Sequence, residues 1–303
     1  MKTDLPRKNA EIAKPETVLS SLRSPAADHF ETEPRGRAHL EVELVFGEST
    51  AISSCATSPL KLLTPCSRGK SVWAYASSFG GGLVAGDETR LDLRIGAGAR
   101  CFIGTQASTK VYRNPSQLPC SHTTHAKLEG GSLLVFAPDA VQAFAGSSYR
   151  QRQEFHLAAD AGLVLLDWFT SGRAARGERW AFDHFQSRND VFNDGRRVFV
   201  DSILLNAGAD AVASPHRTGR FNCFAMLLIV GQPFREAAAA LAAEIFSHPV
   251  ERAATLLCSA SLVQQGTVLR VAGEDVESVS RELKRQLSFL ADFLGDDPWA
   301  RKW

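Results

Sequence analysis

Residues 39–46 read His-Leu-Glu-Val-Glu-Leu-Val-Phe, and this stretch decides the fold class. The apolar residues Leu40, Val42, Leu44 and Phe46 fall on every second position. Successive side chains of a β-strand point to opposite faces, so an apolar period of two is typical of a strand with one buried face. The stretch therefore predicts a half-buried strand.

The same pattern continues along the chain. Leu91, Leu93 and Ile95 alternate with Asp92 and Arg94. Further apolar runs occupy Ser132 to Phe136, Leu163 to Phe169, Arg197 to Leu205, Phe221 to Val230 and Thr267 to Val271. Glycines separate many of these runs at about the spacing of hairpins. The sequence thus predicts a mainly β fold, a large antiparallel domain.

Two segments have a helical pattern instead. Pro233 precedes an alanine-rich segment, 235–246, and proline suits the first turn of a helix. Nearer the C-terminus, apolar residues recur at steps of three and four: Val276, Val279, Leu283, Leu287, Leu290 and Leu294. Gly295 and Pro298 then stop the pattern. We expect about two helices, the last over about 275–294.

The N-terminal residues 1–36 are polar and contain four prolines. Such a segment buries too little apolar surface to offset the entropy lost on ordering, so we expect a flexible arm. The predicted organisation is an arm over 1–36, a single β domain over 37–295 and a tail over 296–303.

Composition excludes several classes of protein. Lys and Arg number 34 against 33 Asp and Glu, a net charge of +1, whereas nucleic-acid-binding proteins carry a clear basic excess. No stretch approaches 18 continuous apolar residues, so no membrane span is expected. The six cysteines show no C-x-x-C pair, and the first residues lack an apolar signal region. We expect a cytoplasmic protein with free thiols.

Two acids fall on strand faces that should be apolar. Asp167 shares a face with Leu163 and Leu165, and Asp201 lies between Phe199 and Ile203. A carboxylate there would be partly desolvated and would need a counter-charge, which Arg173, Arg176 and Glu178 could help to supply in a network. Buried ion pairing as part of the architecture and a polar interior path for an ion both remain open.

Two local motifs have a functional and a structural interpretation. The run from Gly80 to Asp87 is rich in glycine but lacks a phosphate-loop pattern, which favours a tight turn in which Asp87 bonds its local backbone. Cys120, His122 and His125 carry metal-ligand side chains, yet on a strand His125 would point away from the other two. We keep these three as a weak candidate metal site.

An ordered set of motifs resembles one known family. These motifs are Ser58-Pro59-Leu60-Lys61, Gly80 to Asp87, Thr105-Gln106-Ala107-Ser108-Thr109-Lys110-Val111-Tyr112-Arg113, Pro138, and Gly172-Arg173-Ala174 with Gly177-Glu178. In this order and spacing they resemble the urease accessory protein family UreD, also called UreH. The similarity runs from about His39 to Leu205 and continues more weakly towards the C-terminus.

The resemblance implies an elongated two-sheet, β-helix-like domain and a protein that is not an enzyme. Family members act as scaffolds or metallochaperones that bind UreF and the GTPase UreG, dock onto apo-urease and assist GTP-dependent nickel insertion. It implies transient Ni²⁺ with no permanently bound cofactor, and a water-filled tunnel as a possible nickel path. The alternative is a β-scaffold metal-dependent hydrolase or cupin-like enzyme, which would need a fixed metal site or an activated nucleophile.

Two sets of site residues follow as predictions. The first is a nickel path lined by Asp87, Asp167, Glu178 and Asp201, with Lys110, Arg173 and Arg176 balancing charge, since oxygen ligands would release a borderline divalent ion readily. The second is a surface for docking a helical partner such as UreF, formed by the C-terminal stripe and two tail tryptophans: Val279, Leu283, Leu287, Leu290, Trp299 and Trp303. Packing of the stripe on the protein's own sheet is the alternative.

Overall fold

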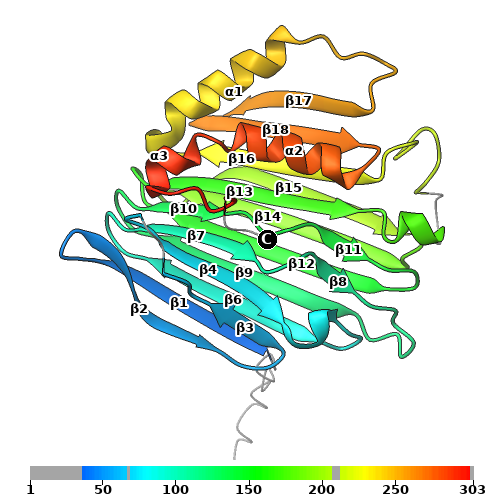
Figure 1. The fold of residues 1–303 in the computed structure, drawn as a ribbon, viewed down its shortest axis with the longest axis horizontal. Coiled ribbons are helices and arrows are strands. Elements are labelled where there is room, and N and C mark those ends of the chain that lie inside the picture. Colours follow the sequence, from blue (N-terminus) through cyan, green and yellow to red (C-terminus); the bar gives the residue numbers. More distant parts are fainter. Residues whose placement is uncertain (1–35, 67–68, 207–211, 301–303) are drawn as a thin grey trace, which may run out of the picture. The chain divides into compact units, whose positions relative to one another are not determined.

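A computed structural model describes residues 36–66, 69–206 and 212–300 (Figure 1). The expected arm over 1–36, apart from Gly36, and Trp303 lie outside the described residues. The described chain is mainly β, with two sheets and three short α-helices, which confirms the predicted fold class. All seven sequence runs expected as strands overlap observed strands.

The first sheet has seven strands. In spatial order they are β15 (Arg196–Asn206), β14 (His184–Asn193), β12 (Ser148–Leu157), β9 (Cys120–Leu128), β6 (Glu88–Ile95), β1 (Gly36–Val45) and β2 (Glu48–Ala56). Leu40 and Val42 of β1 are buried as predicted. Phe46 is not on the strand: it lies in the turn after β1 and is fully exposed.

The second sheet has eleven strands. Its main path is β17 (Leu256–Val263), β18 (Gly266–Gly273), β16 (Cys223–Val230), β13 (Gly162–Thr170), β10 (Leu133–Phe136), β7 (Arg100–Thr105), β4 (Val72–Ser78) and β3 (Leu60–Leu63). A side branch adds β11 (Val141–Ala143), β8 (Thr109–Val111) and β5 (Gly82–Leu83). Three single-turn 3₁₀ helices occur among the described residues: Phe79–Gly81 and Ala174–Arg176 lie between strands, and Gln232–Phe234 follows β16.

The middle of the chain winds as a β-solenoid. From β4 to β14 the long strands alternate between the two sheets, so neighbours within each sheet run parallel. The prediction of a mainly antiparallel domain is therefore wrong for these strands. At Gly96, Gly98, Gly130, Gly131 and Gly162 the chain crosses from one sheet to the other, whereas Gly195 and Gly266 lie at hairpins as predicted. An apolar period of two is the same in either strand direction.

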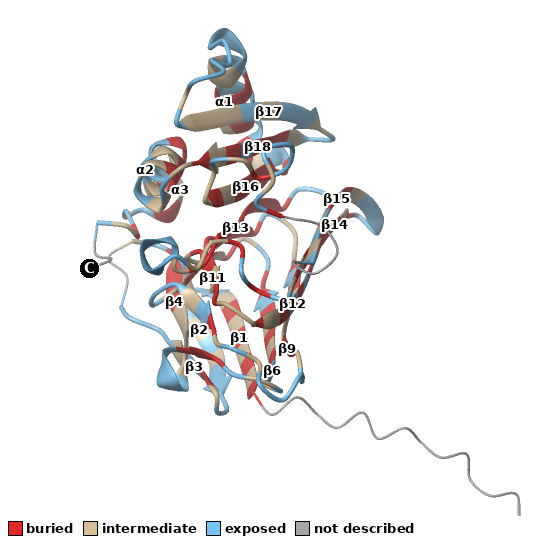
Figure 2. Ribbon diagram, turned by 90° about the vertical axis from the view of Figure 1, so that its right-hand side faces the viewer, coloured by how far each residue is buried: buried red, intermediate tan, exposed pale blue. Residues whose placement is uncertain are grey.

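The structure has three layers (Figure 2). One core cluster fills the space between the sheets and includes Leu40, Leu93 and Leu163. A second cluster lies on the other face of the second sheet, which the helices cover. All nine residues of β13 are buried because both of its faces are covered.

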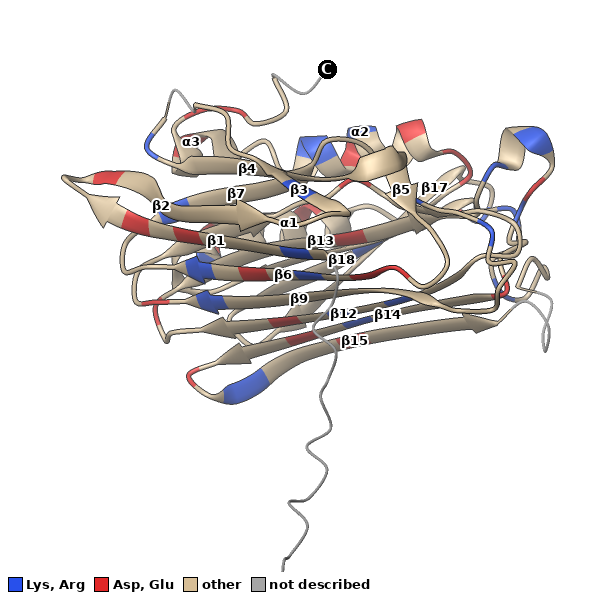
Figure 3. Cartoon of the chain, turned by 90° about the horizontal axis from the view of Figure 1, so that it is seen from below, with Lys and Arg blue, Asp and Glu red and all other residues tan. Residues whose placement is uncertain are grey.

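The outer face of the first sheet is charged (Figure 3). Some of its charges pair along single strands, as in Arg90 with Asp92 and Arg188 with Asp190, whose closest N–O distances are 2.8 and 2.6 Å. Others pair between neighbouring strands, as in Arg94 with Glu41 at 3.3 Å. Residues two apart on a strand share a face, so these pairs keep one side of the sheet polar.

Helix α1 (Arg235–Ser247) agrees with the alanine-rich segment. The C-terminal helix is divided into α2 (Val276–Gln286) and α3 (Leu290–Leu294). Asp275 caps α2, its carboxylate accepting the Ser278 N–H at 2.6 Å, and Gly295 ends α3 with φ +76°. None of the helices within the described residues is long and apolar enough to span a membrane.

The apolar stripe of these helices packs on the chain's own second sheet. Val279, Leu283, Leu287 and Leu290 are each no more than 2% exposed. The prediction that they dock a helical partner is corrected here, because their apolar surface already lies in the protein's own core. Trp299 is half-buried and contacts Phe102, with ring centroids 5.6 Å apart.

Candidate functional site

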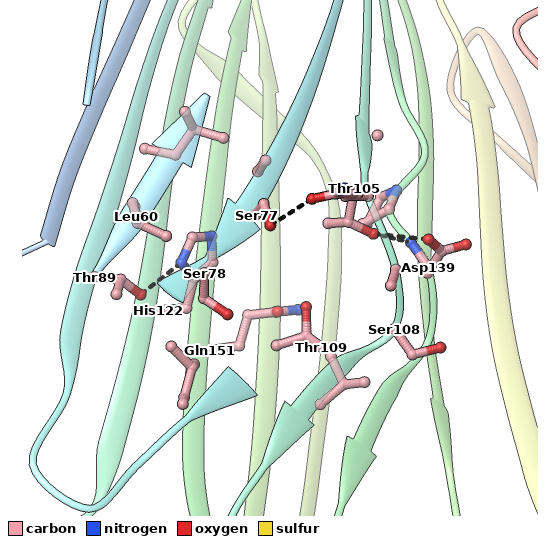
Figure 4. A pocket seen from close by; sticks show the side chains of 18 of the residues that line it. Leu60, Ser77, Ser78, Thr89, Thr105, Ser108, Thr109, His122, Asp139 and Gln151 are labelled. Atoms are coloured by element: carbon pink, nitrogen blue, oxygen red, sulfur yellow. Dashed lines mark hydrogen bonds between the residues drawn. The ribbon is translucent and has the colours of Figure 1, made fainter. Parts of the chain in front are cut away.

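A cavity lined by both apolar and polar residues lies between the two sheets. This central cavity has a volume of about 290 Å³ and is lined from strands of both sheets (Figure 4). Its polar lining comprises Ser77, Ser78, Thr89, Thr105, Gln106, Ser108, Thr109, His122, Asp139, Tyr149, Gln151, Gln153 and Asp167. Most of these groups are hydroxyls and amides, which offer oxygen atoms without a fixed charge.

Asp167 lies at one end of the central cavity and binds across the layers. From β13 it accepts hydrogen bonds from Gln151 Nε2 at 3.0 Å, Ser187 Oγ at 2.6 Å and Asn189 Nδ2 at 2.8 Å, all on the first sheet. Burial raises the pKa of Asp167, and the three hydrogen bonds oppose this shift. The predicted counter-charge is absent from these contacts: three neutral donors satisfy the carboxylate.

A second cavity adjoins the central one beside α2. This helix-side cavity has a volume of about 490 Å³ and includes Ser280, Lys284 and Trp299 in its lining. The two cavities have six lining residues in common, which are Gln106, Ala107, Ser108, Pro138, Asp139 and Trp168.

Asp139 is the carboxylate at this shared boundary. Its Oδ2 accepts the Thr105 hydroxyl at 3.1 Å, and its backbone N–H donates to Thr105 Oγ1 at 2.7 Å. Figure 4 shows Thr105 and Asp139 side by side at the cavity wall. The end of β7 and the loop after β10 are therefore held together where the cavities meet.

A third cavity lies beyond Asp167, beside β15. This β15-side cavity has a volume of about 370 Å³ and a largely apolar lining that includes Asp167, Asp201 and Arg270. Arg270 Nη2 lies 2.7 Å from Asp201 Oδ1, so here the predicted counter-charge exists, although it comes from β18. Asp167 is the residue that the central and β15-side cavities have in common.

His122 is the one imidazole in the lining of the central cavity. Its Nδ1 lies 2.9 Å from Thr89 Oγ1 and its Nε2 lies 3.1 Å from Thr124 Oγ1. Burial lowers the pKa of His122 to about 4, so the ring is neutral at pH 7. A neutral ring places no repulsive charge in the path of a cation.

The structure does not bring His122 and its predicted co-ligands together. Cys120 is buried, with its thiol donating to the Ser148 carbonyl at 3.3 Å, and burial raises its pKa to about 12. His125 lies on the opposite face of β9, in a surface groove. Among the described residues, no group of three His, Cys, Asp or Glu side chains could hold a metal ion.

Asp87 closes the glycine-rich turn. Its Oδ2 accepts the Val84 N–H at 2.8 Å, and Gly80, Gly81 and Gly86 have φ of +78°, +72° and +80°. These φ values favour glycine, so the structure confirms the tight-turn interpretation of this run. Asp87 does not belong to the lining of the three cavities.

Glu178 and Arg173 form a pair at the surface. Arg173 Nε donates to Glu178 Oε2 at 2.8 Å, and the guanidinium lies 4.3 Å from the centre of the Phe144 ring. The hydrogen bond from Arg173 lowers the pKa of Glu178. Arg176 and Lys110 are exposed. Glu178 too is outside the lining of the three cavities.

Sequence reasoning missed part of this site. It did not single out Asp139, Gln151 or Gln153 as site residues. A signal existed for Asp139, because it follows Pro138, and its partner Thr105 begins another of the matched motifs. No sequence signal marked Gln151 and Gln153. They can be recognised only once the structure shows that their strand, β12, faces Asp167 across the cavity.

Three cavities with shared linings therefore contain three carboxylates: Asp139 lies where the helix-side and central cavities meet, Asp167 where the central and β15-side cavities meet, and Asp201 in the wall of the β15-side cavity. Carboxylate and hydroxyl oxygens bind divalent ions, and separate carboxylates bind them more weakly than a closed set of ligands does. The arrangement can pass a small hydrated cation and is poorly suited to retaining it.

Comparison with known proteins gives one consistent family. The family described as "UreD urease accessory protein" matches residues 34–303. The chain is 45% identical to the urease accessory protein UreD of Sorangium cellulosum over 96% of its own length and 92% of the relative. It is 37% identical to UreD of Anaeromyxobacter sp. over 96% and 99% of the two chains. It is 32% identical to the urease accessory protein D of Arabidopsis thaliana over 86% and 98%.

Proposed function

Because this chain belongs to the UreD family of urease accessory proteins, we propose that it assists insertion of nickel into urease. In this proposal it is a cytoplasmic, non-enzymatic scaffold that binds UreF, the GTPase UreG and apo-urease. The observation that carries the proposal is the family match over nearly the whole described chain.

The proposed path of Ni²⁺ runs through the three cavities. Their linings overlap at Asp139 and again at Asp167, so an ion could pass from the helix-side cavity to the β15-side cavity by way of the central one. Ni²⁺ is cargo here and not a resident cofactor. Each carboxylate would replace part of the water shell of Ni²⁺ for a short time.

The charges along this path favour passage over retention. Asp167 is held by neutral donors, so its negative charge is not cancelled by a neighbouring cation, whereas Asp201 is already paired with Arg270. A cation entering the central cavity would compensate the desolvated charge of Asp167. Asp87 and Glu178 stay candidates for contacts outside the cavities, where Arg173 and Arg176 would moderate their charge.

The experiment is co-expression of urease and its accessory proteins with variants of this chain. We expect Asp139→Asn and Asp167→Asn to lower the nickel content of purified urease, measured by mass spectrometry. Asp160→Asn is the matched control, because Asp160 is exposed in a turn. This substitution changes the net charge by the same amount as Asp139→Asn or Asp167→Asn. Pull-down of UreF and UreG with each variant separates a blocked path from a lost complex.

Two results would contradict the proposal at different levels. Fully nickel-loaded urease with both carboxamide variants would exclude the carboxylate path and leave the accessory role intact. Fully active urease in cells that lack this chain would exclude the accessory role itself. Turnover of a small substrate by the purified chain with bound metal would favour the alternative, a β-scaffold metal-dependent hydrolase.

A further inference from the structure

Four strands end the main paths of the two sheets, and three of them are protected against pairing with another chain. β2 has a bulge opposite Glu41/Val42 and packs against β3. β3 has only four residues and carries a lysine. β15 has a bulge opposite Val191/Phe192 and carries charged residues. Bulges, short length and charge are the usual devices that keep sheet edges from adding strands.

β17 is the fourth terminal strand and has none of these devices. Its sequence, Leu-Leu-Cys-Ser-Ala-Ser-Leu-Val over Leu256–Val263, contains no charged residue and no proline. Its eight residues pair with β18 in continuous register without a bulge. Ser259, Ser261 and Leu262 are exposed, Leu262 to 68%. This edge can therefore accept a further strand.

The sequence of β17 is nearly symmetric about Ala260. In antiparallel pairing with its own copy centred on Ala260, Ser259 meets Ser261, Cys258 meets Leu262 and Leu257 meets Val263. Every pair joins two small residues or two apolar ones, and such cross-strand pairs stabilise a sheet. A two-fold axis requires this kind of self-complementary surface.

We propose that β17 pairs antiparallel with β17 of a second copy of this chain, about a two-fold axis at Ala260. The pairing would join the two second sheets into one continuous sheet. A net charge of +1 opposes this association only weakly. The inference goes beyond the proposed function and does not depend on it.

Side chains near the edge agree with this arrangement. Cys258 and Ala260 point to the helix-covered face of the sheet, together with Ile245 of α1. Leu262 shares that face by strand alternation, and in the dimer Cys258 of the second copy would cover it. A two-fold axis normal to the sheet keeps both α1 helices, which pack against β17 and β18, on the same side of the joined sheet.

The test is sedimentation of the full chain and of two double variants that differ by one residue. Ser259→Lys/Ser261→Lys places lysines opposite lysines in the proposed register, so we expect its dimer dissociation constant to rise by about tenfold or more. Ser259→Glu/Ser261→Lys places Glu opposite Lys at both pairs, and we expect it to dimerise like the unsubstituted chain. Thermal melts check that all three fold.

Each outcome decides the proposal. A monomeric unsubstituted chain at tens of micromolar would overturn it, and so would a Lys/Lys variant that dimerises as well as the unsubstituted chain. Loss of the dimer in both variants would exclude this register. Retention by the Glu/Lys variant alone supports the two-fold pairing, because this variant places opposite charges at both substituted pairs of the proposed register. None of these results bears on nickel delivery.

Discussion

Asp167 in the interior and Glu178 at the surface turn are both acids that the sequence singled out, and their surroundings differ. Asp167 is buried, held by three neutral donors, and its pKa is raised by burial. Glu178 is paired with Arg173, and its pKa is lowered by that hydrogen bond. The comparison indicates that Glu178, an acid inside a matched motif, has a structural role at the surface. Asp167, the acid that no neighbouring cation balances, lies deep in the fold.

The largest expected difference between the two acids is in the stability of the chain after each side chain is replaced by alanine. Asp167→Ala removes the acceptor of three buried hydrogen bonds, and each such loss costs roughly 1–3 kcal/mol, so we expect a loss of about 3 kcal/mol or more in the free energy of unfolding. Glu178→Ala should cost much less, because water can reach the Arg173 guanidinium. Urea unfolding of both variants measures the difference. Equal losses would mean that the interior around Asp167 is wet.

A second test uses the pH dependence of the neutral imidazole in the central cavity. His122 binds its proton with a pKa of about 4 in the folded chain and near 6.5 when unfolded. The unfolded chain therefore binds more protons between these values, so stability falls as pH drops from 6.5 to 4. When the pH falls from 7 to 4.5, we expect the free energy of unfolding of the His122→Asn chain to decrease by about 2 kcal/mol less than that of the unsubstituted chain.

The measurement is urea unfolding at the two pH values. Replacing the exposed His156 by Asn provides the control, because that ring lies at the surface beside Glu154. An identical pH dependence of the unsubstituted and His122→Asn chains would show that this ring titrates normally and that the cavity is open to solvent.

A third test compares the signs of two pH slopes. The pKa of Asp167 is above its unfolded value of 3.8, so its contribution to stability falls as pH rises from about 4 through the folded pKa. The pKa of Glu178 is below 4.5, so its contribution is present above that value and is lost as pH falls through the folded pKa. Relative to Asp167→Asn, the unsubstituted chain should become less stable with rising pH; relative to Glu178→Gln, it should become more stable.

Unfolding between pH 3 and 7 measures both slopes. Slopes of the same sign would remove the distinction between the interior acid and the surface acid.

The smallest effect is expected at the surface turn itself. Arg176 is exposed and influences Glu178 only through its charge. We expect Arg176→Gln to change the free energy of unfolding by no more than about 0.5 kcal/mol. A thermal melt at low and high salt checks this. A larger loss that persists at high salt would mean that Arg176 makes a contact beyond charge.

Much of the fold could be predicted from the sequence because strand positions depend on local alternation. The period of two located β1 and β6, a continuous apolar run located β13, and the steps of three and four located α2. Strand direction depends on where the chain goes after each glycine turn, which no local pattern records. The parallel winding was therefore missed.

The site was predicted in part for the same reason. Alternation identified Asp167 and Asp201 as acids on buried faces, and both line cavities. The partners of these acids come from strands distant in sequence: Arg270 for Asp201, and Gln151 and Asn189 for Asp167. The nearby arginines of the surface turn were chosen by proximity in sequence, and the fold uses one of them for Glu178 instead.

In the winding from β4 to β14, the length of the interior along the stacked strands depends on the number of turns. Each turn of the winding adds one strand to each sheet, and neighbouring strands lie about 4.8 Å apart. Insertion or deletion of a whole turn would lengthen or shorten the passage by that step while leaving the other turns in register. On the proposed nickel path, a relative with a different number of turns would carry the ion over a different distance between walls of the same chemistry.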